Sequence, residues 1–151
     1  MKYSFEEDKL LKSDEIEVVV KGQSLTQEAQ NLLDYLEMYQ QDSPKLIPIK
    51  AIDRIQLLKV ADIILIDVND SQLILETING NFKITERLYR FSERLNNPDF
   101  VQVSKHAVIN INHLDYLEDG FSGSMTAFLT NQLKVSVSRK YLKNLSVRLG
   151  L

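Results

Sequence analysis

The sequence contains no cysteine and no tryptophan, and it has only three prolines and five glycines in 151 residues. Without cysteine the chain cannot form a disulfide, a thiolate zinc site or a cysteine nucleophile. Its longest aliphatic run, Ile63 to Ile66, lies between Asp62 and Asp67 and is far shorter than the roughly 20 residues of a membrane-spanning helix. The acidic N-terminus also lacks the apolar core of a signal peptide. We therefore expect a cytoplasmic protein without a membrane partner.

Motifs for catalysis and metal binding are also missing. The only two histidines, His106 and His113, are seven residues apart and do not form an H-E-x-x-H pattern. The sequence has no Walker loop, no G-x-S-x-G and no G-x-G-x-x-G, and Gly120 to Gly123 is better explained as a hairpin turn. We expect no catalytic residue, no metal site and no cofactor, and hence no enzyme. His113 is interpreted as a half-buried or edge histidine and His106 as a residue that faces a partner, with solvated surface as the default for both.

The charge is distributed unevenly along the chain. The net charge of −3 argues against a simple nucleic-acid binder when the chain is taken as a whole. Residues 1–50 carry six basic and ten acidic side chains, whereas residues 97–151 carry six basic and four acidic ones. The last eighteen residues contain five basic side chains and no acid. The pattern predicts a basic C-terminus on an acidic body.

The N-terminal part is predicted to contain a strand over Glu15–Val20 and a helix with an apolar stripe from Leu25 to Tyr39. Ser24 and Gln27 have the spacing of a capping box at the start of this helix. A polar-to-apolar change between Pro44 and Pro48 then marks a boundary. We predict an N-terminal segment at 1–45 and a second domain at 46–151.

Short apolar runs between turn residues predict a mainly β domain after this boundary, so the fold class is α+β overall. Asn79-Gly80 is the strongest hairpin signal. Thr85 is predicted to cap a short helix with Leu88, Phe91 and Leu95 inward, and Ser138 a final helix that Gly150 ends. Strands are expected at residues 54–58, 63–66, 72–75, 82–84, 100–103, 114–117, 125–129 and 133–137.

Two segments combine packing residues with hydrogen-bonding side chains. Between Phe100 and Asn112, polar residues such as Ser104, Lys105 and His106 alternate with aliphatic ones. At the final helix, Arg139 and Lys140 follow Ser138, where free backbone N–H groups favour anions. Such side chains contact phosphates and base edges. Basic residues on an amphipathic helix also form a solvated face, and the pattern by itself favours that interpretation.

These segments resemble the LytTR family of bacterial DNA-binding transcription regulators. The matching runs keep the family's order and spacing, and Ala61–Asp67 is similar to its early strand, so the resemblance covers about residues 47–149. The chain is similar to a subgroup that has a short strand-and-helix N-terminal piece instead of a phosphoacceptor receiver domain. The matching runs are Phe100–Asn110, Leu114–Leu117, Phe121–Gly123 and Val137–Leu142.

The resemblance implies an elongated β domain whose loops, rather than a recognition helix, enter successive major grooves. Three departures from the family are Asp70 in the first loop, where basic or histidine residues are common, Ser124 in place of a basic residue, and Gln132 in place of a glycine. Fewer positive charges predict a shallow salt dependence. The implied DNA-binding residues are Ser71 and Gln72 in the first loop, Ser104, Lys105 and His106 in the second, and Ser138, Arg139 and Lys140 in the third.

The function implied is sequence-specific transcription regulation on double-stranded DNA, at promoter direct repeats or half-sites. A homodimer is expected from the Leu25 to Tyr39 stripe, although packing of this stripe against the chain's own Val18–Val20 explains it equally well. An alternative function is a protein-interaction module that has the fold and antagonises a related regulator. The acidic composition, Asp70 and Ser124 favour this alternative, and the basic start of the last helix favours DNA binding.

Overall fold

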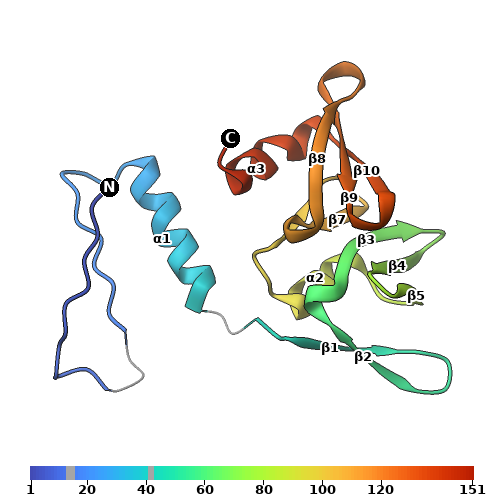
Figure 1. Cartoon of the computed structure of the whole chain (residues 1–151), viewed down its shortest axis with the longest axis horizontal. Helices are drawn as coiled ribbons and strands as arrows, with labels where there is room; N and C mark the ends of the chain where they lie inside the picture. Colours follow the sequence, from blue (N-terminus) through green and yellow to red (C-terminus); the bar gives the residue numbers. More distant parts are fainter. Residues whose placement is uncertain (13–15, 41–42) are drawn as a thin grey trace. The chain divides into compact units, whose positions relative to one another are not determined.

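The computed structural model describes residues 1–12, 16–40 and 43–151. The chain divides into two compact units, residues 1–37 and residues 38–151 (Figure 1). Helix α1 (Gln27–Gln40) contributes most of its length to the first unit. In the described part of the chain, no helix is long and apolar enough to span a membrane.

The first unit confirms the predicted helix and corrects the predicted strand. Residues 16–20 form no strand, and Glu15 lies outside the described residues. A β-branched run becomes a strand only where a neighbouring strand accepts its hydrogen bonds, and the described residues of this unit offer none. The predicted cap was also wrong, because Thr26 Oγ1, and not Ser24, accepts the Ala29 N–H at 3.2 Å.

The second unit consists of three antiparallel sheets and two further helices (Figure 1). The two-stranded sheet is β1 (Leu46–Lys50) and β2 (Ile55–Lys59). The five-stranded sheet has the order β5-β4-β3-β7-β6, with β3 (Ile63–Asn69), β4 (Gln72–Thr77), β5 (Gly80–Ile84), β6 (Phe100–Gln102) and β7 (Ala107–Asn110). The three-stranded sheet is β10 (Leu133–Val137), β9 (Met125–Leu129) and β8 (Leu114–Asp119), and the helices are α2 (Leu88–Leu95) and α3 (Arg139–Leu149).

The central strand β3 lies between two hydrophobic cores. Ile63 and Ile66 belong to one core, with the β1–β2 hairpin and α2. Ile64 and Leu65 belong to the other, with β9, β10 and α3. A register shift between Ile63 and Leu65 interrupts the usual alternation of sides. Burial on both faces explains why this strand is an unbroken aliphatic run.

The predicted strands of the second unit are present, and two further strands appear that the sequence did not predict, β1 and β7. β1 pairs with β2 from Leu46 to Lys50, within the segment interpreted as a boundary. Pro48 is tolerated because a two-stranded sheet leaves an edge free of partners. Asn79-Gly80 does close the β4–β5 hairpin, with Gly80 at φ 123°. Gln132, in place of the family's glycine, takes φ 60°.

Two of the predicted helix caps were wrong in detail. Helix α2 has Arg87 and not Thr85 as its N-cap residue, without a side-chain cap, and the preceding Glu86 pairs instead with Arg94 at 2.9 Å. Ser138 occupies the N-cap position of α3, but its hydroxyl makes no capping hydrogen bond. Its backbone N–H instead donates to the Val103 carbonyl at 2.8 Å. Gly150 ends α3 at φ 76°, as predicted.

Candidate nucleic-acid interface

The first predicted loop is the two-residue turn between β3 and β4. Asn69 pairs with Gln72, and Asp70 and Ser71 between them take φ values of 47° and 66°. Positive φ at both central positions defines a type I′ turn, whose twist matches that of the flanking strands. Asp70, Ser71 and Gln72 are all exposed. The turn therefore presents a short polar tip that includes one acid.

The second predicted loop joins β6 to β7. The Val103 N–H donates to the Ala107 carbonyl at 2.9 Å, which closes a tight connection. Inside it, Ser104 Oγ accepts the His106 N–H at 3.1 Å, a turn in which a hydroxyl replaces a backbone acceptor. Ser104 thus stabilises the loop conformation, and its hydroxyl can still donate a hydrogen bond to a ligand. Lys105 and His106 are exposed.

The third predicted loop is the junction of β10 with α3. Arg139 and Lys140 occupy the first turn of the helix and are exposed. Because the Ser138 hydroxyl does not cap the helix, the first N–H groups of α3 keep their capacity to bind an anion. The Lys140 ammonium lies 5.7 Å from the centre of the Tyr141 ring.

Backbone hydrogen bonds bring the three loops together. The Val68 N–H, beside the first loop, donates to the His106 carbonyl of the second at 2.9 Å. The Ser138 N–H of the third loop donates to the Val103 carbonyl at the base of the second, at 2.8 Å. The second loop is therefore bonded to the third loop and to the end of β3, the strand that leads into the first loop.

Gly123 supports the third loop, a role that the sequence did not reveal. A methyl group at this position would lie 3.3 Å from Cδ of Arg139, and Gly123 takes φ 77°. Space and backbone conformation both favour glycine here. Gly123 stands in the Phe121-Ser122-Gly123 run quoted above, so a signal existed in the sequence, but its contact with Arg139 requires the fold.

The two histidines have different surroundings. His106 is exposed in the second loop. His113 is half-buried, as predicted, with Nε2 2.7 Å from the Ala61 carbonyl and Nδ1 3.2 Å from the Thr130 hydroxyl. It therefore links the short 3-10 helix before β8 to the one before β3. Among residues 1–12, 16–40 and 43–151, no group of three or more potential ligand side chains is placed to hold a metal ion.

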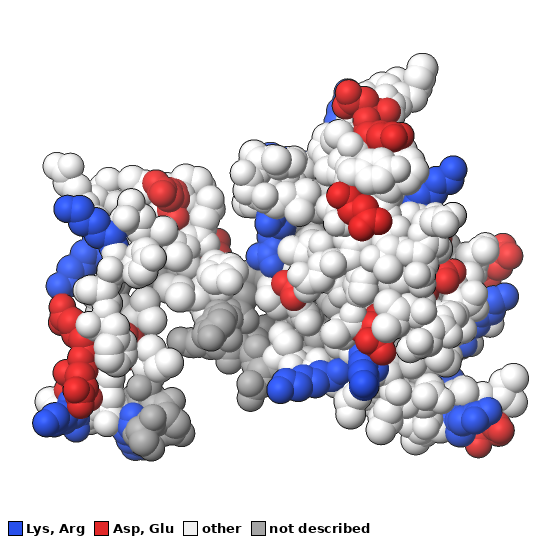
Figure 2. Space-filling model, in the orientation of Figure 1, with Lys and Arg blue, Asp and Glu red and all other residues white. Residues whose placement is uncertain are grey.

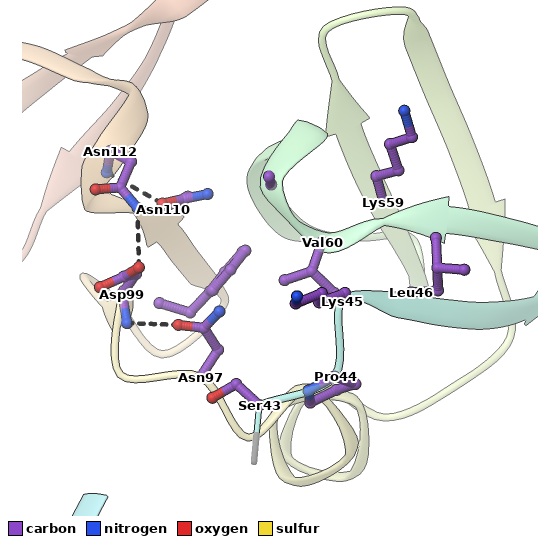
Figure 3. Close-up of a pocket in the computed structure, with 12 residues that line it drawn as sticks. Ser43, Pro44, Lys45, Leu46, Lys59, Val60, Asn97, Asp99, Asn110 and Asn112 are labelled. Atoms are coloured by element: carbon purple, nitrogen blue, oxygen red, sulfur yellow. Dashed lines mark hydrogen bonds between the residues drawn. The ribbon is translucent and has the colours of Figure 1, made fainter. Parts of the chain in front are cut away.

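A hollow of about 460 Å³ lies beside the base of the β1–β2 hairpin (Figure 3). Asn97, Asp99 and Asn112 form a hydrogen-bonded chain along one wall, and Lys45 and Lys59 lie across from it. Nowhere in the described part of the chain is a buried side-chain polar atom without a partner. The side-chain hydrogen bonds of this wall link the residues just before β6 to Asn112, just after β7.

Comparison with known proteins identifies the class of protein to which this fold and these loops belong. Residues 53–150 match the family model of the LytTr DNA-binding domain, and the chain belongs to the LytTR family. The solved LytTr DNA-binding domain from Bacillus cereus superposes with a TM-score of 0.64 at 16% identity, over 72% of this chain and 99% of that one. This similarity confirms the predicted mainly β fold.

The curated relatives are longer regulators. The "Sensory transduction protein LytR" of Staphylococcus saprophyticus is 29% identical over 107 residues, which is 71% of this chain and 42% of that protein. The "Transcriptional regulatory protein LytR" of Staphylococcus aureus is 30% identical over 105 residues, which is 70% of this chain and 43% of that protein. The chain thus spans less than half the length of the curated relatives it matches.

Proposed function

We propose that this protein is a sequence-specific transcription regulator that inserts its three loops into successive major grooves of double-stranded DNA. The observation that carries the proposal is the continuous row of loops, joined by the Val68 to His106 and Ser138 to Val103 hydrogen bonds, in a domain of the LytTR family. Relatives named as LytR regulators support it. The protein acts in the cytoplasm, without enzymatic activity or cofactor.

The three loops divide the tasks of base recognition and phosphate binding. Arg139 is the principal base-reading residue, because its guanidinium pairs with two acceptors of a guanine. Lys105 and Lys140 neutralise phosphates, and the Ser138 hydroxyl and the N-terminal N–H groups of α3 add uncharged donors. His106, Ser104, Ser71 and Gln72 supply further hydrogen bonds at the groove edges.

Lys105→Ala tests the assignment of the second loop. We expect binding to weaken about equally for specific and scrambled duplexes, and the slope of log K against log salt to fall by about one unit, since a phosphate contact carries no sequence information. Fluorescence-anisotropy titration with a duplex from the protein's own promoter, at several salt concentrations, measures both quantities. An unchanged salt slope would remove Lys105 from the interface.

The first unit supplies self-association in this proposal. None of its described residues is buried; Leu25, two residues before α1, is 69% exposed, and Leu33 on α1 is 39% exposed. An amphipathic helix without a core of its own is stabilised when a partner covers its apolar side. A homodimer also provides the two DNA-binding domains that reach high affinity at paired half-sites.

Light scattering after gel filtration tests the homodimer. We expect the full chain to have twice the mass of one chain at micromolar concentration, and the double variant Leu25→Glu/Leu33→Glu to have the mass of one. The matched control Gln27→Glu/Asp34→Glu changes polar positions of the same helix and should leave the mass unchanged. A monomeric parent protein would contradict the dimer and favour packing of α1 within its own chain.

A second candidate function rests on the first loop. Asp70 is exposed at the tip of the β3–β4 turn, where its carboxylate repels phosphate. This observation favours an interaction module that binds a related regulator instead of DNA. If no duplex is bound in a genome-wide selection, and if Lys105→Ala leaves the residual affinity for scrambled duplexes unchanged, the protein is an interaction module and not a DNA-binding regulator.

A further inference from the structure

The β1–β2 hairpin presents a basic and apolar face to solvent. Its other face is fixed, because Ile47, Ile49 and Leu58 are buried in the core and the Arg94 guanidinium donates to the Pro48 carbonyl at 3.1 Å. Its three basic residues and its one acid are all exposed, and Asp53 pairs with Arg54. We call the outward face the basic hairpin surface; it comprises Lys50, Ile52, Arg54, Ile55, Leu57 and Lys59.

The β8–β9 hairpin presents the opposite charge. Residues 114–129 contain three acids and neither lysine nor arginine, and the one base beside them on β10 is Lys134, which pairs with Phe128. On the outer side of these strands the Tyr116 and Phe128 rings stack with centroids 4.6 Å apart, and Phe121 at the connection is 90% exposed. We call this the acidic hairpin surface; it comprises Tyr116, Glu118, Asp119, Phe121 and Phe128.

The two surfaces lie at opposite ends of the second unit. Figure 1 shows the β1–β2 hairpin extending from one end and the β8–β9 connection from the other. Figure 2 shows acidic side chains gathered over the β8 end and lysine and arginine side chains along the β1–β2 end. Six of the ten exposed large hydrophobic residues in this unit belong to the two hairpins: Leu46, Ile52, Ile55, Leu57, Tyr116 and Phe121.

We propose that the basic hairpin surface of one copy of this protein binds the acidic hairpin surface of a second copy, head to tail. Opposite charges together with exposed apolar and aromatic side chains make the surfaces complementary. A symmetric contact made by one of these surfaces alone would place that surface against itself and bring like charges together. Because the complementary surfaces lie at opposite ends, the contact is heterologous and leaves one free surface of each kind for a further copy.

On DNA this contact favours copies that follow one another in the same orientation. This role rests on the proposed function, whereas the contact between copies does not. Each surface offers few apolar side chains, so the contact is weak in solution. It becomes effective when adjacent DNA sites hold two copies close together, because binding is then intramolecular. Such copies occupy direct repeats, since inverted repeats would place identical ends together.

The absence of cysteine permits a direct test by cross-linking without DNA. One full-length chain carries Ala51→Cys, beside Ile52, and a second, mass-tagged chain carries Ser122→Cys, beside Phe121. The two chains are mixed and treated with a bis-maleimide. Random pairing would give about twice as much mixed product as either symmetric product, and we expect the mixed product to exceed this ratio clearly. A mixed yield at or below the random value, or equal to that with Asn79→Cys on the β4–β5 turn, overturns the proposal.

Charge reversal tests the complementarity. Glu118→Lys/Asp119→Lys in the Ser122→Cys chain should slow cross-linking by about fivefold or more. Lys50→Glu/Arg54→Glu in the Ala51→Cys chain should then restore the rate, whereas absence of any rescue overturns the pairing.

The chain's acidic first unit is the competing occupant of the basic hairpin surface, since residues 1–37 carry four basic and nine acidic side chains. If Ala51→Cys cross-links faster to Ser4→Cys than to Ser122→Cys, the basic hairpin surface binds the first unit, and the proposed contact with the acidic hairpin surface is overturned. Because no arm uses DNA, the outcome is independent of the titrations that test the proposed function.

Discussion

Replacing Arg139 by alanine should weaken binding to a specific duplex by about 1–3 kcal/mol, or about five- to 150-fold in Kd. The guanidinium is exposed at the first turn of α3, with its stem against Gly123. In the proposed complex, alanine removes a charge-assisted, two-pronged contact to guanine. Binding to a scrambled duplex should change much less, so the ratio between the two affinities should fall. Anisotropy titrations with both duplexes measure this ratio.

Two further variants separate base recognition from charge. Arg139→Lys keeps the positive charge and loses the planar fork, so we expect scrambled-duplex binding to persist and discrimination to be lost. Arg54→Ala removes the same charge from the β1–β2 turn and should leave binding to a single site unchanged. If Arg139→Ala and Arg54→Ala had equal effects, Arg139 would be one surface charge among others and not a base-reading residue.

The second large effect concerns stability and falls on Asn110. Its side chain is 2% exposed, with Nδ2 donating to the Ile63 carbonyl at 3.0 Å and Oδ1 accepting the Asn112 N–H at 3.0 Å. Leucine fills a similar volume and leaves a carbonyl inside the core without a donor. We expect Asn110→Leu to lower the free energy of unfolding by about 2–3 kcal/mol.

Thermal denaturation followed by circular dichroism measures this loss, which corresponds to a fall of about 5–10 °C in Tm. The control is Asn112→Ala, because Asn112 is exposed and its backbone N–H, the group that Asn110 accepts, is retained. We expect this control to stay within about 1 kcal/mol of the parent protein. Equal values of Tm for Asn110→Leu and the parent would show that the buried amide is dispensable.

Much of the second unit could be predicted because its strands have strong local patterns. The ranges expected for β9 and β10 coincide with the observed strands, since turn residues bound both on either side. The hairpin of β1 and β2 was only half predicted, because Pro48 signals a boundary locally while burial of Ile47 and Ile49 depends on distant elements. The N-terminal strand was wrongly predicted for the converse reason, because residues 16–20 have the local propensity of a strand but no neighbouring strand to pair with.

The candidate site divides in the same way. The residue types of the second and third loops were visible as polar and basic side chains between packing positions, and their role stays a prediction until it is measured. The contact between these loops was not visible. A backbone hydrogen bond from Ser138 to Val103 spans 35 residues and depends on no side chain, so it leaves no trace in the sequence. The close packing of the Arg139 side chain against Gly123 likewise depends on the fold.

The hydrogen bonds on both sides of the middle loop fix the distances between the three loops. Neither the end of β3, which carries the first loop, nor the third loop can slide past the middle loop without breaking a hydrogen bond to the His106 or the Val103 carbonyl. If the loops contact base pairs as proposed, the intervals between those base pairs are set by the protein fold. An operator with one base pair inserted between two contacted groups has to be bent or overwound to fit, and the energy of that distortion falls on the DNA. Operators of this protein should thus tolerate changes of base identity between the contacted groups far better than changes of spacing.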